Sequence, residues 1–281
     1  MVHREGKYDG KKYILEKFES IDEFLKEIEG RPIAKDWKGT HTAETLRAKR
    51  DYDDSRFRNV KNYKEAREQF VNGTKAKAEM LKAFQTEVDP RQRQAVNAPC
   101  GCVPIVANAL RGVPDAMIDI RRKRIPKATK LIIDMTVHCG TSCSDIIQAG
   151  KQIIAAVAKL EGEGISTEIT CSVDSKVYDM YVGMSVTVKN AGQGFSAARV
   201  SFPMSSPAFL RVFSFMQMSS LEGVPYDSGY GSAIAYGRHG KQLEDYYRTM
   251  YGDGIYFSLA NVIRSGQWEI DNAISKWRKG R

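Results

Sequence analysis

Residues 130–170 read KLIIDMTVHCGTSCSDIIQAGKQIIAAVAKLEGEGISTEIT, and this stretch decides the fold. A short apolar run, Leu131–Ile133, ends at Asp134 and is followed by a small polar loop over residues 136–144. An apolar-periodic segment comes next, and a second strand-like run begins at Ile165 after a glycine-rich turn. The order predicts strand, loop, helix, turn and strand, which together form one βαβ unit.

The pattern on either side of this unit predicts an α/β protein. Strand candidates follow at 165–173, 182–189 and 198–203, and the last amphipathic helix spans about 267–279. We expect a three-layer sandwich over residues 96–281, with a helical, basic region over residues 1–95 before it. Ser144 is the expected N-cap of the helix 144–161. The side chains expected to be buried between sheet and helices are Ile132, Ile153, Val157, Phe209 and Phe213.

Composition bounds the class of protein. The 281 residues are 42% hydrophobic and 27% charged, and they carry a formal net charge of +9. No apolar run approaches the length of a membrane span, and the N-terminus lacks the apolar segment of a secretory signal. We therefore expect no membrane partner. Five cysteines without such a signal favour reduced thiols in a cytosol-like compartment.

The central stretch resembles a known kind of domain. The run LIIDMTVHCGTSCSDIIQAGKQIIAAVAKLEGEGISTEI is similar in layout to the first strand and helix of von Willebrand factor A-like domains. Those domains place an aspartate at the end of the first strand, then a serine-rich loop, then a long helix. The resemblance covers about residues 117–280 and implies a von Willebrand A-like sandwich.

A second resemblance spans most of the chain. Residues 186–215, VTVKNAGQGFSAARVSFPMSSPAFLRVFSF, resemble a family of uncharacterised tailed-phage proteins. The aromatic-rich run FESIDEFLKEI and the turn at 37–40 match the same family. The matching residues of the longer run are Lys189, Arg199, Phe202, Pro207, Ala208, Leu210 and Arg211. The resemblance implies a phage or prophage origin, with the protein in the host cytoplasm or the virion, and brings no activity.

The loop after the first strand is a candidate metal site. Mg²⁺ prefers oxygen ligands in near-octahedral geometry, and Asp134, Thr136 and Ser142 offer such oxygens. His138 stands where the adhesion motif of von Willebrand A-like domains has its second hydroxyl, and nitrogen is a poor Mg²⁺ ligand. The alternative is that Asp134 only satisfies loop amides or caps the following helix.

Zinc is a second possibility for the same loop. His138, Cys139 and Cys143 cluster in sequence, and Cys100 and Cys102 lie upstream. Structural zinc takes four nitrogen or sulfur ligands, usually from cysteine pairs two to four residues apart. The alternative is that these are small thiols packed beside a sheet, which is where free cysteine usually lies.

A basic segment is a candidate nucleic-acid contact. Residues 121–130, RRKRIPKATK, hold six basic residues in ten. Lysine and arginine at this density neutralise phosphates. The alternative is a solvated connection between two strands. The candidate phosphate-binding residues are Arg121, Arg122, Lys123, Arg124, Lys127 and Lys130.

These observations favour a phage-encoded, non-enzymatic interaction or assembly protein with phage or host protein partners. Two alternatives stay open: a nucleic-acid-binding phage protein, and a divalent-metal-dependent enzyme or adhesion-type module. No catalytic residue is predicted, because no nucleophile has an identifiable neighbouring base.

Overall fold

A computed structural model of the chain describes residues 1–31, 51–52, 55–72, 93–122, 128–224, 231–238 and 240–280. Within these residues the body is built on a seven-stranded sheet in the order β1-β2-β8-β7-β6-β10, with β9 paired to β7. Strands β6, β7 and β10 run parallel, and β8 returns antiparallel along β7. The strands of this sheet are β1 (Val2–Tyr8), β2 (Lys11–Phe18), β6 (Thr129–Asp134), β7 (Thr167–Val177), β8 (Met180–Lys189), β9 (Ser232–Ala233) and β10 (Ile255–Ser258).

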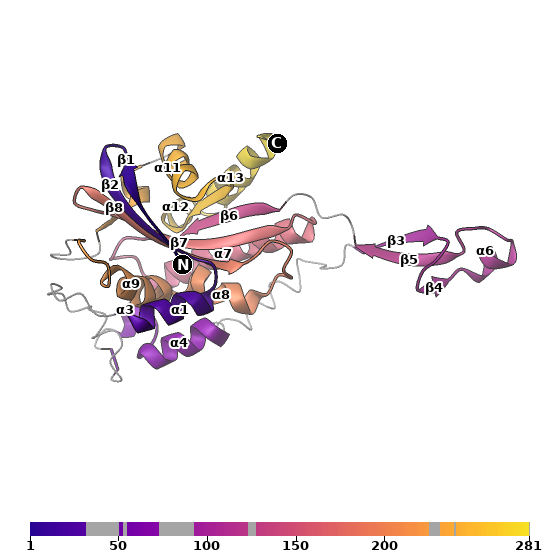
Figure 1. Ribbon diagram of the computed structural model, residues 1–281, viewed down its shortest axis with the longest axis horizontal. Helices are drawn as coiled ribbons and strands as arrows, with labels where there is room; N and C mark the ends of the chain where they lie inside the picture. The colour runs from indigo at the N-terminus through magenta and orange to yellow at the C-terminus, as the bar shows by residue number, and fades with distance from the viewer. Residues whose placement is uncertain are drawn as a thin grey trace.

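Helices lie on both sides of the sheet, so the predicted α/β class is confirmed (Figure 1). The first group comes mainly from the N-terminal half and the segment after β8: α1 (Ile21–Gly30), α3 (Ser55–Arg58), α4 (Tyr63–Asn72), α7 (Cys143–Gly162), α8 (Ala197–Ser205), the π-helical turn η1 (Phe209–Ser214) and α9 (Phe215–Met218). The second group closes the chain: α10 (Ile234–Gly237), α11 (Lys241–Tyr251), α12 (Leu259–Ser265) and α13 (Gln267–Lys279). The two groups meet where α12 and α13 pack against α7.

The predicted βαβ unit is β6, α7 and β7. Helix α7 begins one residue earlier than expected, and its N-cap is Ser142 rather than Ser144. The Ser142 Oγ accepts a hydrogen bond from the amide of Asp145 at 3.1 Å, which satisfies one of the free N–H groups of the first turn. Asp145 lies in that turn, where a negative charge is favourable to the helix dipole.

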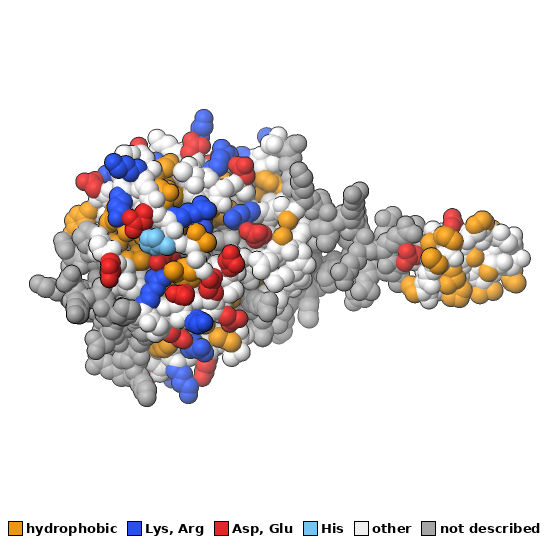
Figure 2. Space-filling model, viewed as in Figure 1, with side chains coloured by type: hydrophobic (Ala, Val, Ile, Leu, Met, Phe, Trp, Pro, Cys, Tyr) orange, Lys and Arg blue, Asp and Glu red, His pale blue; other side chains and the backbone are white. Residues whose placement is uncertain are grey.

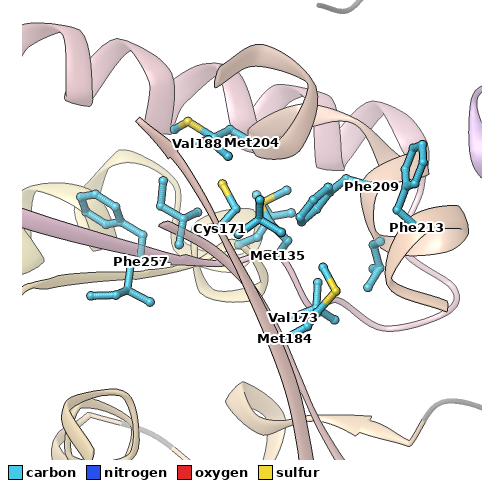
Figure 3. Close-up of a cluster of buried hydrophobic side chains, with 14 of the residues drawn as sticks. Met135, Cys171, Val173, Met184, Val188, Met204, Phe209, Phe213 and Phe257 are labelled. Atoms are coloured by element: carbon cyan, nitrogen blue, oxygen red, sulfur yellow. The ribbon is translucent and has the colours of Figure 1, made fainter. Parts of the chain in front are cut away.

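The core lies between the sheet and the helices, and the five side chains predicted to be buried are all fully buried there. Figure 3 shows part of it, with Val173 and Met184 from β7 and β8 beside Phe209 and Phe213 from the η1 turn. Aromatic rings tie in the outer helices as well. Phe70 of α4 stacks on Phe202 of α8 with ring centroids 4.8 Å apart.

Two expectations about secondary structure are wrong. The N-terminal region is not wholly helical, because β1 and β2 form a hairpin that joins the central sheet through β8. Residues from both sides of the expected boundary after residue 95 therefore share one sheet. The expected strand 198–203 is part of helix α8. This helix approaches α7 so closely that a Cβ on Gly150 would lie 2.4 Å from the carbonyl oxygen of Met204.

Residues 93–122 form a separate three-stranded sheet, which we call the arm. Its strands are β3 (Arg93–Ala98), β4 (Val103–Pro104) and β5 (Met117–Arg122), in the order β3-β5-β4, with the short helix α6 (Val106–Leu110) between β4 and β5. The arm stands away from the body in Figure 1. Arg93 pairs with Arg122 in the antiparallel register, so the chain enters and leaves the arm at neighbouring positions.

Candidate functional site

The parallel strands end at a cluster of buried polar side chains. Asp134, the last residue of β6, is level with Ser172 of β7 and Ser258 of β10, and its side chain is fully buried. Ligand sites of open α/β sheets commonly lie at the carboxyl ends of the strands. We call this group, together with the residues bonded to it, the acid–tyrosine cluster: Asp134, Thr136, Asp174, Tyr246, Tyr247 and Tyr251.

Three donors hold the carboxylate of Asp134. Its Oδ1 accepts from the backbone N–H of Thr136 at 2.9 Å and from the Thr136 hydroxyl at 2.5 Å. Its Oδ2 accepts from the Tyr247 hydroxyl at 2.5 Å. Both carboxylate oxygens are therefore engaged by donors of the protein itself.

A second buried carboxyl, Asp174, lies two residues beyond Ser172 on β7. Its Oδ1 accepts from the hydroxyls of Tyr246 at 3.0 Å and Tyr251 at 2.7 Å. The backbone N–H of Asp174 donates to the Thr136 hydroxyl at 2.8 Å, so Thr136 links the two acids. Across the hairpin stands Gly183, where an added Cβ would lie only 2.6 Å from Asp174 Oδ1. The carboxyl thus needs a glycine opposite it.

Helix α11 supplies all three tyrosines, and their spacing places the three rings on the side of the helix that faces the sheet. Tyr247 and Tyr251 are four residues apart and share a helix face, and Tyr246 flanks them. Burial raises the pKa of each of these phenols well above its usual range, so the hydroxyls keep their protons and donate. Each phenol therefore serves as a fixed hydrogen-bond donor to a buried acid.

Burial also raises the pKa values of the two carboxyls. Loss of solvation raises the pKa of Asp134 to about 6, against the opposing effect of its hydrogen bonds. Loss of solvation and the neighbouring Asp134 charge raise the pKa of Asp174 to about 7. Two like charges in one buried site resist simultaneous ionisation. The raised pKa values mean that the pair of carboxyls keeps a proton to a higher pH than two solvated aspartates would.

The predicted Mg²⁺ ligands are only partly brought together. Asp134 and Thr136 meet, but they bond to each other. Ser142 is exposed and caps α7, whereas Asp134 is buried. Among the residues that the structure describes, no group of three or more His, Cys, Asp or Glu side chains is arranged to hold a metal. The donor set fits a hydrogen-bonded acid better than a hydrated cation, and magnesium binding stays a prediction.

The predicted zinc ligands lie on different elements. Cys139 is exposed in the loop, with its Sγ 3.8 Å from Nδ1 of His138. The Sγ of Cys143, at the start of α7, donates to the carbonyl of Arg56 at 2.9 Å. Cys100 and Cys102 are exposed on the arm, between β3 and β4. Zinc binding also stays a prediction.

One residue of the predicted phosphate-binding set is placed in detail. Lys130 donates from Nζ to the carbonyl of Tyr251 at 3.2 Å and lies 3.6 Å from Glu168, so it is bound to the body. Arg121 and Arg122 belong to β5 at the base of the arm. The others, Lys123, Arg124 and Lys127, lie outside the described residues.

Sequence reasoning missed Asp174, the three tyrosines and the role of Arg211. The guanidinium of Arg211 is buried and donates to the carbonyls of Phe57 at 2.6 Å and Thr141 at 2.7 Å. It also lies over the Phe57 ring, 3.8 Å from its centroid. Arg211 therefore fixes the loop that follows β6.

The arm presents a different kind of surface. Large apolar side chains are exposed along it, with Leu110 at 83% and Val106 at 63% of full exposure. Val103 and Val113 are exposed too. From Asn97 to Ile118 the sequence holds only two charged residues, Arg111 and Asp115. Orange apolar atoms gather on the arm in Figure 2.

Comparison with known proteins places the chain in one family. A family model described as a domain of unknown function, DUF7192, matches residues 3–270, so the chain belongs to that family. No curated protein and no solved structure matches it. Across the described part of the chain, no helix has the length and apolar character needed to cross a membrane.

Proposed function

We propose that this DUF7192 protein is a non-enzymatic interaction or assembly protein, and that the arm is its docking element. The observation that carries the proposal is the exposed apolar surface of the arm, defined by Val103, Val106, Leu110 and Val113. Soluble proteins seldom expose contiguous apolar patches unless a partner covers them.

The size of the arm supports the same conclusion. Units shorter than about 40 residues rarely bury enough apolar surface to be stable without a partner, a disulfide or a metal. All five cysteines of the chain are free thiols, including both of those on the arm. Full burial of a valine or leucine side chain stabilises a protein by about 1.5–3 kcal/mol. A partner that covers the arm would provide this stabilisation for each apolar side chain that it buries.

The partner we favour is a second copy of the chain. Between residues 97 and 118, the stretch that carries the exposed apolar side chains, the charged residues are one cation, Arg111, and one anion, Asp115. In a two-fold contact the same patch meets itself, and residue i of one copy faces residue j of the other. Such symmetry can bring Arg111 of each copy to Asp115 of its neighbour, while the apolar side chains pack together.

The acid–tyrosine cluster supports a non-enzymatic body. Its carboxylates are buried, and tyrosine and threonine donors already occupy them. The von Willebrand A-like layout belongs to the same proposal. It is supported by Asp134 at the end of β6, the loop that follows and the long helix α7. The phage origin, in virion or host cytoplasm, rests on the resemblance of residues 186–215 to tailed-phage proteins.

The test is the oligomeric state of the purified chain in sedimentation velocity over a range of concentrations. The chain is expected to associate, and Leu110→Asp is expected to shift it toward the monomer because a charge cannot be buried in an apolar contact without a large cost. Val71→Asp is the matched control, since Val71 is an exposed valine on α4 of the body. A wild-type chain that is monomeric throughout, or a Leu110→Asp variant that associates as before, would overturn the proposal.

A further inference from the structure

A small pocket opens beside the acid–tyrosine cluster, at the C-terminal end of β10 and between α11, α12 and α13. Its volume is about 240 Å³. That is below the roughly 300–1,000 Å³ of pockets that take drug-sized molecules, and well above the roughly 30 Å³ that one water occupies in the liquid. The pocket therefore has room for one small molecule. The lining residues that bear on its chemistry are Tyr247, Tyr256, Ser258, Asn261, Trp268 and Asn272.

Ser258 is a buried polar side chain with no partner of its own. Its side chain is 3% exposed, and its Oγ has no hydrogen-bond partner among the described residues. Ser258 is level with Asp134 across the parallel pair and two residues beyond Tyr256, so all three side chains point to the face that α11 covers. An unmade hydrogen bond in a buried hydroxyl costs about 1–3 kcal/mol. A ligand hydroxyl in the pocket would remove that cost.

Aromatic rings form the apolar part of the pocket. The rings of Tyr247 and Tyr256 stack with centroids 5.7 Å apart and an interplanar angle of 20°. Trp268 is 65% exposed although it lines the same pocket, so much of its ring is open to a ligand. Tyr247 and Tyr256 cover each other, so Trp268 is the exposed aromatic face of these three that the C–H face of a ring-shaped ligand can stack on.

The charges around the pocket are balanced. Lys276 is paired with Glu244, and Glu269 accepts a hydrogen bond from Asn261. Arg264, the remaining cation of the lining, lies over the ring of Tyr236 at 5.9 Å. The lining thus has two cations and two anions, together with amide and hydroxyl groups that both donate and accept. This combination suits a neutral molecule rich in hydroxyl groups better than an anion or a cation.

We propose that this pocket is a binding site for a single neutral sugar ring of monosaccharide size. The ring stacks on Trp268 at the mouth, and one of its hydroxyls bonds to Ser258 Oγ at the base. Asn261 and Asn272 bond to further hydroxyls at the rim. The site is separate from the docking surface of the arm and is independent of the function proposed for it.

The experiment is saturation-transfer NMR on the full chain with D-glucose, D-galactose and N-acetyl-D-glucosamine, each titrated into the millimolar range. At least one of these sugars is expected to bind saturably. Trp268→Ala is expected to weaken that binding by about tenfold or more, because the stacking face is lost. Ser258→Ala is expected to weaken it by about fivefold, the effect of one neutral hydrogen bond.

Ser172→Ala is the matched control. It removes a buried serine hydroxyl from the strand on the other side of Asp134, at the same level of the sheet and outside the pocket lining. Its binding is expected to equal that of the wild type. Trp268 is exposed, so its replacement leaves the fold intact, which circular dichroism checks. Absence of saturable binding for all three sugars overturns the proposal, and so does binding that Trp268→Ala and Ser258→Ala leave unchanged.

Discussion

Replacing Asp174 by asparagine removes one of the two buried carboxyls and leaves the shape of the side chain unchanged. The pKa of Asp174 is raised from 3.8 to about 7 in the folded protein. A raised pKa means that the folded state keeps a proton that the unfolded chain has already lost. Between the unfolded and folded pKa values the unfolded chain binds fewer protons, so stability falls as pH rises.

The magnitude follows from the proton count. Each pH unit within this window costs about 1.36 kcal/mol for one such group. From about pH 5 to about pH 7, where the folded carboxyl is itself half ionised at the upper end, Asp174 therefore removes about 2 kcal/mol from the free energy of unfolding. Below about pH 4, where the carboxyl is protonated in both states, this loss is absent. Asp174→Asn does not titrate, so its stability should decline less by this amount over the same range.

Urea unfolding followed by circular dichroism at about pH 5, 6 and 7 measures the difference. The control is Asp179→Asn, the same substitution at an exposed turn residue whose pKa is lowered by its hydrogen bond to Lys11. Its curve should run parallel to that of the wild type over this range. If the curves of Asp174→Asn and the wild type are also parallel, Asp174 does not hold a proton in the folded state and the reasoning fails.

Three further outcomes are expected. Ile153→Ala, at a fully buried position on α7, should lower the free energy of unfolding by about 2–5 kcal/mol in urea melts, and a loss below about 0.5 kcal/mol would contradict the packing of that face. Millimolar Mg²⁺ should leave the melting temperature unchanged, because the oxygens of Asp134 are already bonded; a rise that disappears in Asp134→Ala would reveal a metal site. Joint replacement of Arg121, Arg122 and Arg124 by alanine should change the stability little. It should also leave the affinity for DNA unchanged, which filter binding at two salt concentrations measures. Micromolar binding by the wild type that is lost in this variant would make nucleic-acid association the leading function.

Local patterns in the sequence were enough to predict the central unit. The apolar run before Asp134 and the periodic face of residues 144–161 identify β6 and α7, because burial there follows regular spacing. The apolar run Tyr13–Leu15 is strand-like and lies within β2, but its partner β1 was not predicted, since β1 lies at the edge of the sheet and its side chains are mostly exposed. An edge strand needs no apolar alternation, so its sequence resembles a polar loop.

The acid–tyrosine cluster was only half predictable. Asp134 stands out as an acid at the end of an apolar run. Asp174 lies inside β7, whereas a charged residue in a sequence usually indicates that a buried strand has ended. Its burial depends on Gly183 across the hairpin and on tyrosines more than seventy residues along the chain. The four-residue spacing of Tyr247 and Tyr251 was the available signal that the charged helix α11 has a buried aromatic face.

The pairing of Arg93 with Arg122 has an evolutionary consequence. A segment whose two ends are adjacent can be inserted, exchanged or deleted without changing the distance that the rest of the chain must span. Residues 93–122 meet this condition, so the arm can diversify by wholesale replacement while the sheet and its helices stay under constant packing constraints. If the arm is the docking element, as we propose, a change of binding partner requires changes in this one segment and leaves the packing of the body untouched.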